Sequence, residues 1–266
     1  MNFNMIPAYS SALFISDIHL TPSMPITAQR LIDFCEKEAR SVEAVFILGD
    51  LFEYWVGDDA SLRSPFHLEI KNALANLALN VKIYYLHGNR DFLIGADFLK
   101  KTGMTLLPDP TKVTLAGSEY LLSHGDILCT ADSAYQLFRK WVRKPWLQQL
   151  FLKMPLNWRR NIAQQLRSNS TAQYQRAARF EPETVQMKVD VTLSACANLV
   201  DQFKTYQLIH GHTHLPTRHH ENLNAVEWQR WVLSDWDLDH PESVLPKASA
   251  LRIDANGVRY LDLVKA

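Results

Sequence analysis

The segment Leu13-Phe14-Ile15-Ser16-Asp17-Ile18-His19 decides the fold, because a short apolar run in it leads directly into an aspartate and a histidine. A run of this length and composition is typical of a buried strand. The same order recurs at Gly49-Asp50, Gly88-Asn89-Arg90-Asp91, His124-Gly125-Asp126 and Gly211-His212-Thr213-His214. Since an open α/β sheet presents its ligand crevice at the ends of its strands, these segments predict one shared site.

Short strands and helices alternate along the rest of the sequence. Strands are predicted at residues 12–15, 44–48, 81–86, 120–123 and 206–210, and helices at 27–39 and 68–79. Two further strands, 250–254 and 258–263, flank the hairpin turn signal Ala255-Asn256-Gly257. We therefore predict an α/β fold with a layered β-sheet core flanked by helices, in a single domain over 1–266. Residues 221–247 show no pattern that predicts their structure.

Between residues 131 and 180 the pattern becomes helical, basic and aromatic. From Asp132 to Phe180 there are ten Lys and Arg against one acid, so this segment carries +9 and the remainder −9 in a chain of net charge zero. It contains Trp141, Trp146 and Trp158, and its prolines break it into separate helices. We predict a helical cap inserted into the domain.

The composition limits the class of protein. A hydrophobic fraction of 47% and a charged fraction of 21% are those of an ordinary globular chain, and a net charge of zero gives no argument for a nucleic-acid partner. Cys35, Cys129 and Cys196 form no disulfide framework, which favours a reducing compartment. Neither a signal-peptide pattern nor a membrane-spanning run is present, so we expect a cytoplasmic protein. No obligate protein partner is evident.

The polar residues at the predicted strand ends have two interpretations. Taken singly, Asp17 with His19 reads as a turn and a surface histidine, His124 as a hydrogen-bonded residue, and Asp50 or Asn89 as a helix cap or turn former. Taken jointly, seven such residues predict metal binding: Asp17, His19, Asp50, Asn89, His124, His212 and His214. Hard oxygens mixed with imidazoles suit Mn, Fe, Zn or Co better than Mg or Ca, and the set is large enough for two divalent ions.

In their order, Asp-x-His, Gly-Asp, Gly-Asn-Arg-Asp, His-Gly-Asp and Gly-His-x-His resemble the motifs of the calcineurin-like metallophosphoesterases. This resemblance implies that Asp17, His19 and His214 hold one Mn²⁺ ion and that Asn89, His124 and His212 hold the other. It also implies that Asp50 bridges the two. Two cations roughly 3.5 to 4 Å apart can orient a hydroxide for in-line attack on phosphorus.

From residue 13 to 216 the chain more closely resembles the branch of this family that cleaves UDP-2,3-diacylglucosamine. The likeness lies in Leu48-Gly49-Asp50-Leu51-Phe52-Glu53, in His87-Gly88-Asn89-Arg90-Asp91-Phe92-Leu93 and in Lys144-Pro145-Trp146-Leu147. It implies hydrolysis of the diphosphate to UMP and 2,3-diacylglucosamine 1-phosphate (lipid X) in lipid A biosynthesis, with attack on the phosphorus on the nucleotide side.

The same resemblance implies roles for individual residues. The implied catalytic residues are Asp50, Asn89, Arg90 and His212, and the implied substrate contacts are Asn89, Arg90, His212, Asp132 and Ser170. After Ser170 the chain departs from the branch, because Tyr174, Gln175, Arg176 and Ala177 stand where it has a polar residue and then lysine. Arg176 would be the cation available there, unless it faces solvent.

Arg90 bears on the choice of reaction, because the wider family usually has histidine at this position. A histidine could protonate a leaving alkoxide, whereas arginine stays charged and its planar fork suits phosphate oxygens. A phosphate leaving group, with a last pKa of about 6, needs no such acid. Arg90 therefore favours cleavage of an anhydride over an ester. The alternative is a surface arginine paired with Asp91.

The cap also has competing interpretations. Most of its apolar stripe is expected to be internal helix packing, and a solvated basic face is the default for such a run of charge. Tryptophan with Lys and Arg also suits an anionic bilayer surface, and the resemblance favours a lipid-binding cap on the cytoplasmic side of the inner membrane. Competing functions are a general phosphodiesterase or phosphoprotein phosphatase, and a noncatalytic module, which would have lost ligands; none is lost here.

Overall fold

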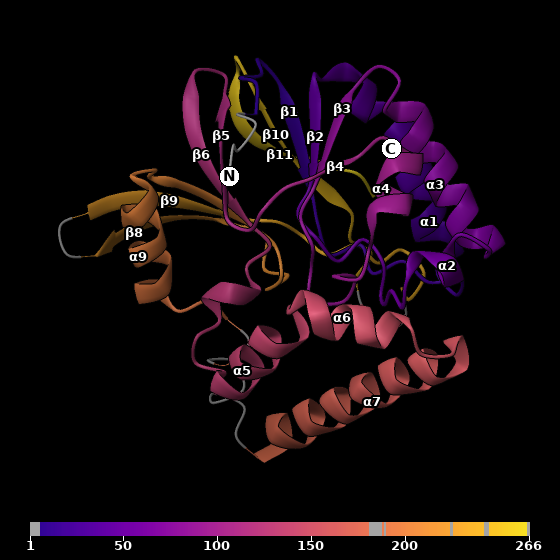
Figure 1. The fold of residues 1–266 in the computed structure, drawn as a ribbon. Coiled ribbons are helices and arrows are strands. Elements are labelled where there is room, and N and C mark those ends of the chain that lie inside the picture. The colour runs from indigo at the N-terminus through magenta and orange to yellow at the C-terminus, as the bar shows by residue number, and fades with distance from the viewer. Residues whose placement is uncertain (1–5, 181–187, 189, 224–225, 242–244, 265–266) are drawn as a thin grey trace.

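Two β-sheets pack face to face, with helices covering their outer faces (Figure 1). The computed structural model describes residues 6–180, 188, 190–223, 226–241 and 245–264; within 169–180 it describes the helix but not its side chains. This architecture confirms the predicted α/β layered fold.

The first sheet has six strands and carries three of the predicted site segments. Its order is β11 (Gly257–Asp262), β10 (Ser249–Asp254), β1 (Ala12–Ile15), β2 (Ala44–Ile47), β3 (Lys82–Tyr85) and β4 (Thr105–Leu106). Strands β1 to β4 run parallel, and β10 pairs antiparallel with β1. Its helices are α1 (Pro25–Glu36), α2 (Asp58–Ser61), α3 (Pro65–Leu77) and α4 (Ala96–Thr102). Because β1, β2 and β3 are parallel, the loops that follow them emerge at the same edge.

The second sheet supplies the remaining site segments. Its order is β5 (Thr111–Leu115), β6 (Ser118–Ser123), β7 (Gln207–His210), β9 (Val226–Val232) and β8 (Arg218–Leu223). Strands β6, β7 and β9 run parallel, and α9 (Leu193–Phe203) packs on the outer face. Two 3₁₀ turns complete the body, η1 (Glu38–Ser41) and η2 (Asp126–Leu128).

Alternating side chains along the central strands build separate apolar layers. Phe14 of β1 and Phe46 of β2 stack 4.9 Å apart in the layer between the sheets. Leu13 and Ile15 point to the other face, where they join the core under α1 and α3. Both faces of β1 and β2 are therefore buried, which explains why these strands read as continuous apolar runs.

The sequence predictions of secondary structure need three corrections. The helix predicted over 27–39 begins at Pro25, ends at Glu36 and is followed by η1, and the helix predicted over 68–79 begins at Pro65 and ends at Leu77. Residues 221–247, which showed no pattern, include most of the β8–β9 hairpin. Strand β8 lies at the edge of its sheet and reads Arg-His-His-Glu-Asn-Leu, so it lacks the apolar alternation that marks a half-buried strand.

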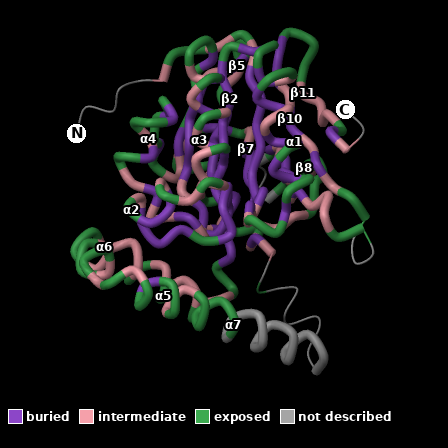
Figure 2. Tube along the Cα trace, turned by 90° about the vertical axis from the view of Figure 1, so that its right-hand side faces the viewer, coloured by how far each residue is buried: buried purple, intermediate pink, exposed green. Residues whose placement is uncertain are grey.

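The predicted cap is present as three helices, α5 (Ser133–Val142), α6 (Pro145–Leu152) and α7 (Leu156–Phe180), beside one end of the two sheets (Figure 1). Pro145 begins α6, as its missing N–H and fixed φ allow. Buried residues concentrate in the two-sheet body, whereas α5 and α6 are half-buried or exposed (Figure 2). Among the described residues, none of the helices combines the length and apolar character needed to span a bilayer.

Candidate metal centre

The loops that follow β1, β2 and β7 hold unusual backbone conformations. Of the seven non-glycine residues with positive φ in the described ranges, five are predicted ligands: Asp17, His19, Asp50, His212 and His214. Only a small left-handed region is open to non-glycine residues, and Asp and His enter it more readily than most. Such conformations cluster at functional sites, where the surrounding structure compensates their cost.

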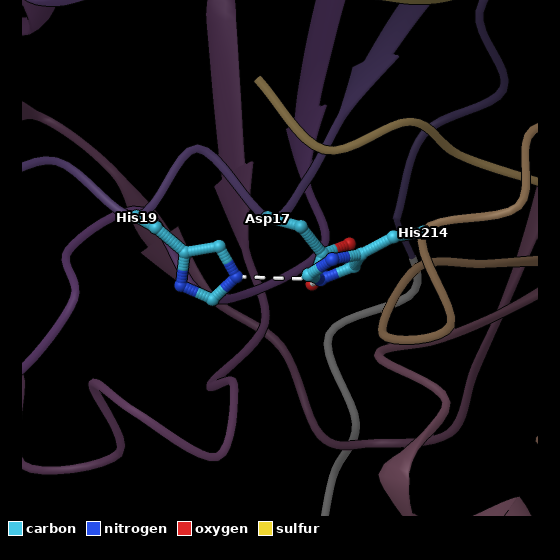
Figure 3. Close-up of side chains that lie close together, drawn as sticks. All are labelled: Asp17, His19 and His214. Carbon is cyan, nitrogen blue, oxygen red and sulfur yellow. Dashed lines mark hydrogen bonds and ion pairs between the residues drawn. The ribbon is translucent and has the colours of Figure 1, made fainter. Parts of the chain in front are cut away.

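Asp17, His19 and His214 converge on one point (Figure 3). Nε2 of His19 lies 3.3 Å from Nε2 of His214, and that nitrogen lies 3.4 Å from Oδ1 of Asp17. Oδ2 of Asp17 is already occupied, because it accepts hydrogen bonds from Ser16 and from the backbone N–H of His212. The free edges of a carboxylate and two imidazoles therefore face the same small volume.

Asn89, His124 and His212 form a second convergent group. Oδ1 of Asn89 lies 3.0 Å from Nε2 of His124 and 3.0 Å from Nδ1 of His212. On its far side, Nδ1 of His124 lies 2.7 Å from the carbonyl oxygen of Leu48, which directs Nε2 toward Asn89.

Asp50 lies between the two groups. Its Oδ2 atom is 3.9 Å from Nε2 of His19 and 3.8 Å from Nε2 of His124. Its Oδ1 atom accepts the backbone N–H of Arg90 at 2.8 Å. Burial raises the pKa of Asp50 to about 6, so this carboxylate lies where a shared cation would offset the cost of burying its charge.

The electrostatics of the second group suit cation binding. Burial lowers the pKa of His124, but the carboxylates of Asp50, Asp17 and Asp126 outweigh burial and bring it to about 9. Burial lowers the pKa of His212 to about 3, which keeps this imidazole neutral. The same carboxylates that stabilise the proton on His124 would stabilise a metal cation that replaces it.

Glycine at position 88 is required by close approach to Asp50. A Cβ atom at Gly88 would lie 1.9 Å from Oδ1 and 2.3 Å from the backbone nitrogen of Asp50. Gly49 also needs to be glycine, because its φ is +90° and a Cβ there would lie 2.6 Å from the backbone of Gly88. The Gly49-Asp50 and Gly88-Asn89 segments therefore pack too closely to accommodate a side chain at either glycine.

Sequence reasoning assigned no role to several acidic residues that surround the seven. Asp91 is fully buried and accepts backbone N–H groups from Leu51 at 2.8 Å and Gly88 at 3.0 Å, joining the loops after β2 and β3. Asp235 approaches Nδ1 of His214 at 3.7 Å. In the sequence, only the position of such a residue could have indicated its role, as with Asp91 at the end of the Gly-Asn-Arg-Asp motif.

Asp126 joins the cap to the centre. Its Oδ2 atom accepts hydrogen bonds at 2.7 Å from the hydroxyl of Tyr135 and from Nε of Arg139, both on α5. Arg143, at the end of α5, donates to the carbonyl oxygen of Gly88 at 2.7 Å. At the start of α7 the buried Arg159 pairs with Asp59 of α2. The cap thus contacts the loops that carry Asn89 and His124 through α5, and it contacts α2 through α7.

The predicted substrate contacts have different surroundings. Asp132 caps α5 by accepting the backbone N–H of Tyr135 at 2.9 Å. Ser170 and Arg176 lie on α7, but their side chains are outside the described part of the structure. Arg90 faces Glu53, with its Nη1 atom 3.5 Å from Oε1. The alternative pairing of Arg90 with Asp91 is wrong, because both oxygens of Asp91 bind backbone N–H groups.

The cap does not bury its apolar stripe, contrary to the expectation of internal helix packing. No residue of α5 or α6 is buried, and Trp146 and Trp158 are 56% and 63% exposed. Up to residue 168, where the side chains are described, the other exposed large apolar side chains of the cap are Leu137, Phe138, Trp141, Leu150, Leu152 and Leu166. Lys144 lies 3.9 Å from the centre of the Trp141 ring, so cations and aromatic rings share this surface.

Two sheets with convergent carboxylate, amide and imidazole groups at their strand ends define a metallophosphoesterase, and the chain belongs to the calcineurin-like phosphoesterase family, whose model matches residues 11–216. Curated relatives place it further, within the family whose members are named UDP-2,3-diacylglucosamine hydrolase. The relative from Ralstonia nicotianae is 47% identical over 95% of this chain and 92% of its own length. That from Tolumonas auensis is 45% identical over 85% and 89%.

A third relative with this name, from Neisseria meningitidis serogroup C, is 41% identical over 98% of this chain and its entire own length. The alignment therefore includes the cap as well as the two-sheet body. Among solved structures, an archaeal phosphodiesterase covers 95% of this chain and 99% of its own at 14% identity, with a TM-score of 0.44.

Proposed function

We propose that this protein hydrolyses the diphosphate of UDP-2,3-diacylglucosamine, giving UMP and 2,3-diacylglucosamine 1-phosphate in lipid A biosynthesis. The observation that carries this proposal is the position of Asp50, whose Oδ2 atom faces one ligand group through His19 and the other through His124. The relatives' shared name supports the substrate. We treat residues 1–266 as one domain, with the cap inserted at about 131–180.

The donor set fits two divalent cations. In this proposal Asp17, His19 and His214 hold one ion, Asn89, His124 and His212 hold the other, and Asp50 bridges them. Imidazoles mixed with oxygens favour Mn²⁺ over the harder Mg²⁺. When bound, two such ions activate water and neutralise charge on the phosphoryl oxygens. Two contacts within the chain orient these donors. The carbonyl oxygen of Leu48 lies beside Nδ1 of His124, and the backbone N–H of Arg90 donates to Asp50.

Arg90 is proposed to bind phosphate oxygens beside the centre. Its backbone is fixed by Asp50, and its side chain is 36% exposed at the rim with Glu53 as its acidic neighbour. A guanidinium there can hold two phosphate oxygens at once. We include Asn89 and His212, and from the cap Asp132 and Ser170, among the substrate contacts.

The cap is proposed to hold the acyl chains and to place the protein on the cytoplasmic side of the inner membrane. The half-exposed tryptophans interleaved with lysines support this proposal, since such a surface suits an anionic bilayer.

Replacing Trp146 and Trp158 together by serine is expected to weaken binding to anionic phospholipid vesicles about 100-fold, which is about tenfold for each side chain. Burying one large apolar side chain contributes about 1.5 kcal/mol or more, which corresponds to about tenfold in affinity. Sedimentation with vesicles measures this. The control is Leu79→Ser, because Leu79 is 78% exposed outside the cap. If the tryptophan variant and the control bind vesicles equally well, the proposal that the cap contacts the membrane is refuted.

The proposed reaction is tested by stripping the protein of metal, adding Mn²⁺ and following UMP release from UDP-2,3-diacylglucosamine. We expect rapid Mn²⁺-dependent release, little hydrolysis of UDP-glucosamine without acyl chains, and little attack on an aryl phosphodiester. Activity confined to the aryl phosphodiester would keep the family's chemistry and discard the lipid substrate.

A further inference from the structure

Glu53 is a nearly buried carboxylate next to the centre that none of the proposed steps uses. It is 7% exposed and follows Asp50 by three residues. Its Oε2 atom lies 3.0 Å from Nδ1 of His19. Its Oε1 atom faces two guanidinium groups, that of Arg90 at 3.5 Å and that of Arg167 from α7. The two oxygens thus have separate partners.

The backbone fixes Glu53 beside His19. The loops after β1 and β2 pair along a short ladder, in which His19 N–H donates to Asp50 and Leu20 N–H donates to Leu51, both at 3.0 Å. Glu53 N–H then donates back to the carbonyl oxygen of Leu20 at 3.3 Å. These backbone hydrogen bonds place the backbones of Glu53 and His19 close together.

The contact determines which ring nitrogen of His19 faces the centre. The negative charge of Glu53, with Oε2 3.0 Å from Nδ1, favours a proton on Nδ1 and leaves the lone pair on Nε2. Nε2 is the atom near His214 and Asp50. The carbonyl oxygen of Leu48 stands in the same relation to His124 at 2.7 Å. A carboxylate or carbonyl behind a metal-binding histidine fixes its tautomer and orientation.

We infer that Glu53 is a positioning residue for the metal centre, which acts by holding His19 with Nε2 directed inward, and that its contacts with Arg90 and Arg167 are secondary. This inference rests on the metal ligands assigned in the proposed function. It predicts an effect on one ion more than on the other, because only one group of ligands includes His19.

The test compares Glu53→Met with Glu53→Gln, since both keep the side-chain length and only Gln keeps an oxygen that can lie beside Nδ1 of His19. Mn²⁺ is titrated calorimetrically into metal-stripped protein, after circular dichroism has shown each variant to be folded. We expect Glu53→Met to weaken one of the two binding steps by about 10- to 100-fold and to leave the other unchanged. Glu53→Gln is expected to bind close to the parent protein.

Arg167→Ala is the matched control, because it removes the contact between Glu53 and the cap and leaves His19 paired. We expect it to bind both ions like the parent. Unchanged Mn²⁺ binding by Glu53→Met, equal losses in Met and Gln, or an equal loss in Arg167→Ala would each overturn the inference. The titration uses no substrate. If the parent protein binds two ions but does not hydrolyse UDP-2,3-diacylglucosamine, the proposed substrate is refuted and the role of Glu53 is not affected.

Discussion

Asp50→Asn is expected to lower turnover on the order of 10³-fold while the protein stays folded. An amide in place of the carboxylate removes the negative charge between His19 and His124. Charge stabilisation by bound metal is worth several kcal/mol, and each 1.36 kcal/mol of barrier is about tenfold in rate. The asparagine oxygen can still accept the Arg90 N–H that Oδ1 accepts at 2.8 Å. The measurement is Mn²⁺-dependent UMP release.

The stability of the metal-free variant supplies the control. Because the pKa of Asp50 is raised to about 6 in the folded protein from about 4 when unfolded, its contribution to stability falls as pH rises between these values. Asparagine does not titrate, so Asp50→Asn does not lose stability in this way as pH rises. At pH 7 with chelator present, the urea concentration at the midpoint of unfolding should therefore equal or exceed that of the parent protein. Full activity in Asp50→Asn would refute the bridging assignment.

The sequence predicted the parts of the fold in which local pattern and tertiary environment agree. Strand β1 begins and ends where its apolar run does, because both of its faces are buried and every residue in it is apolar. The edge strand β8 could not be predicted in this way. Its hydrogen bonds to β9, rather than its polar side chains, hold it in the sheet.

The sequence predicted which residues form the candidate site, but it did not predict how their side chains are arranged in space. Its histidines and carboxylates were visible because Asp-x-His and His-x-His recur after apolar runs. The roles of the acids behind them were not visible. Glu53 approaches His19 only when two loops distant in sequence meet, and Asp126 gains Tyr135 only when α5 packs beside η2. The cap's helices were visible, but the exposure of their apolar side is a tertiary property that a helical pattern leaves open.

Arg90→His is expected to lower hydrolysis of the UDP-linked diphosphate by about 10²- to 10³-fold, the usual cost of losing one donor to transition-state charge. Metal content should not change, because Arg90 holds Asp50 through its backbone N–H, which histidine also has. Arg90→Lys keeps the positive charge and loses the planar fork, so its activity should lie between those of the parent and the histidine variant. The measurements are UMP release and bound Mn²⁺ per chain.

The same variant separates anhydride from ester chemistry. A phosphate leaving group departs without a proton, whereas an alkoxide benefits from an acid that arginine cannot supply. If Arg90 serves anhydride cleavage, Arg90→His should lose far more activity on the UDP-linked lipid than on a phosphodiester with an alkyl leaving group, and the ratio of the two rates should shift toward the ester. Equal losses on both substrates would mean that Arg90 binds phosphate without selecting the bond, and loss of metal would mean that the rim contact with Glu53 supports the centre itself.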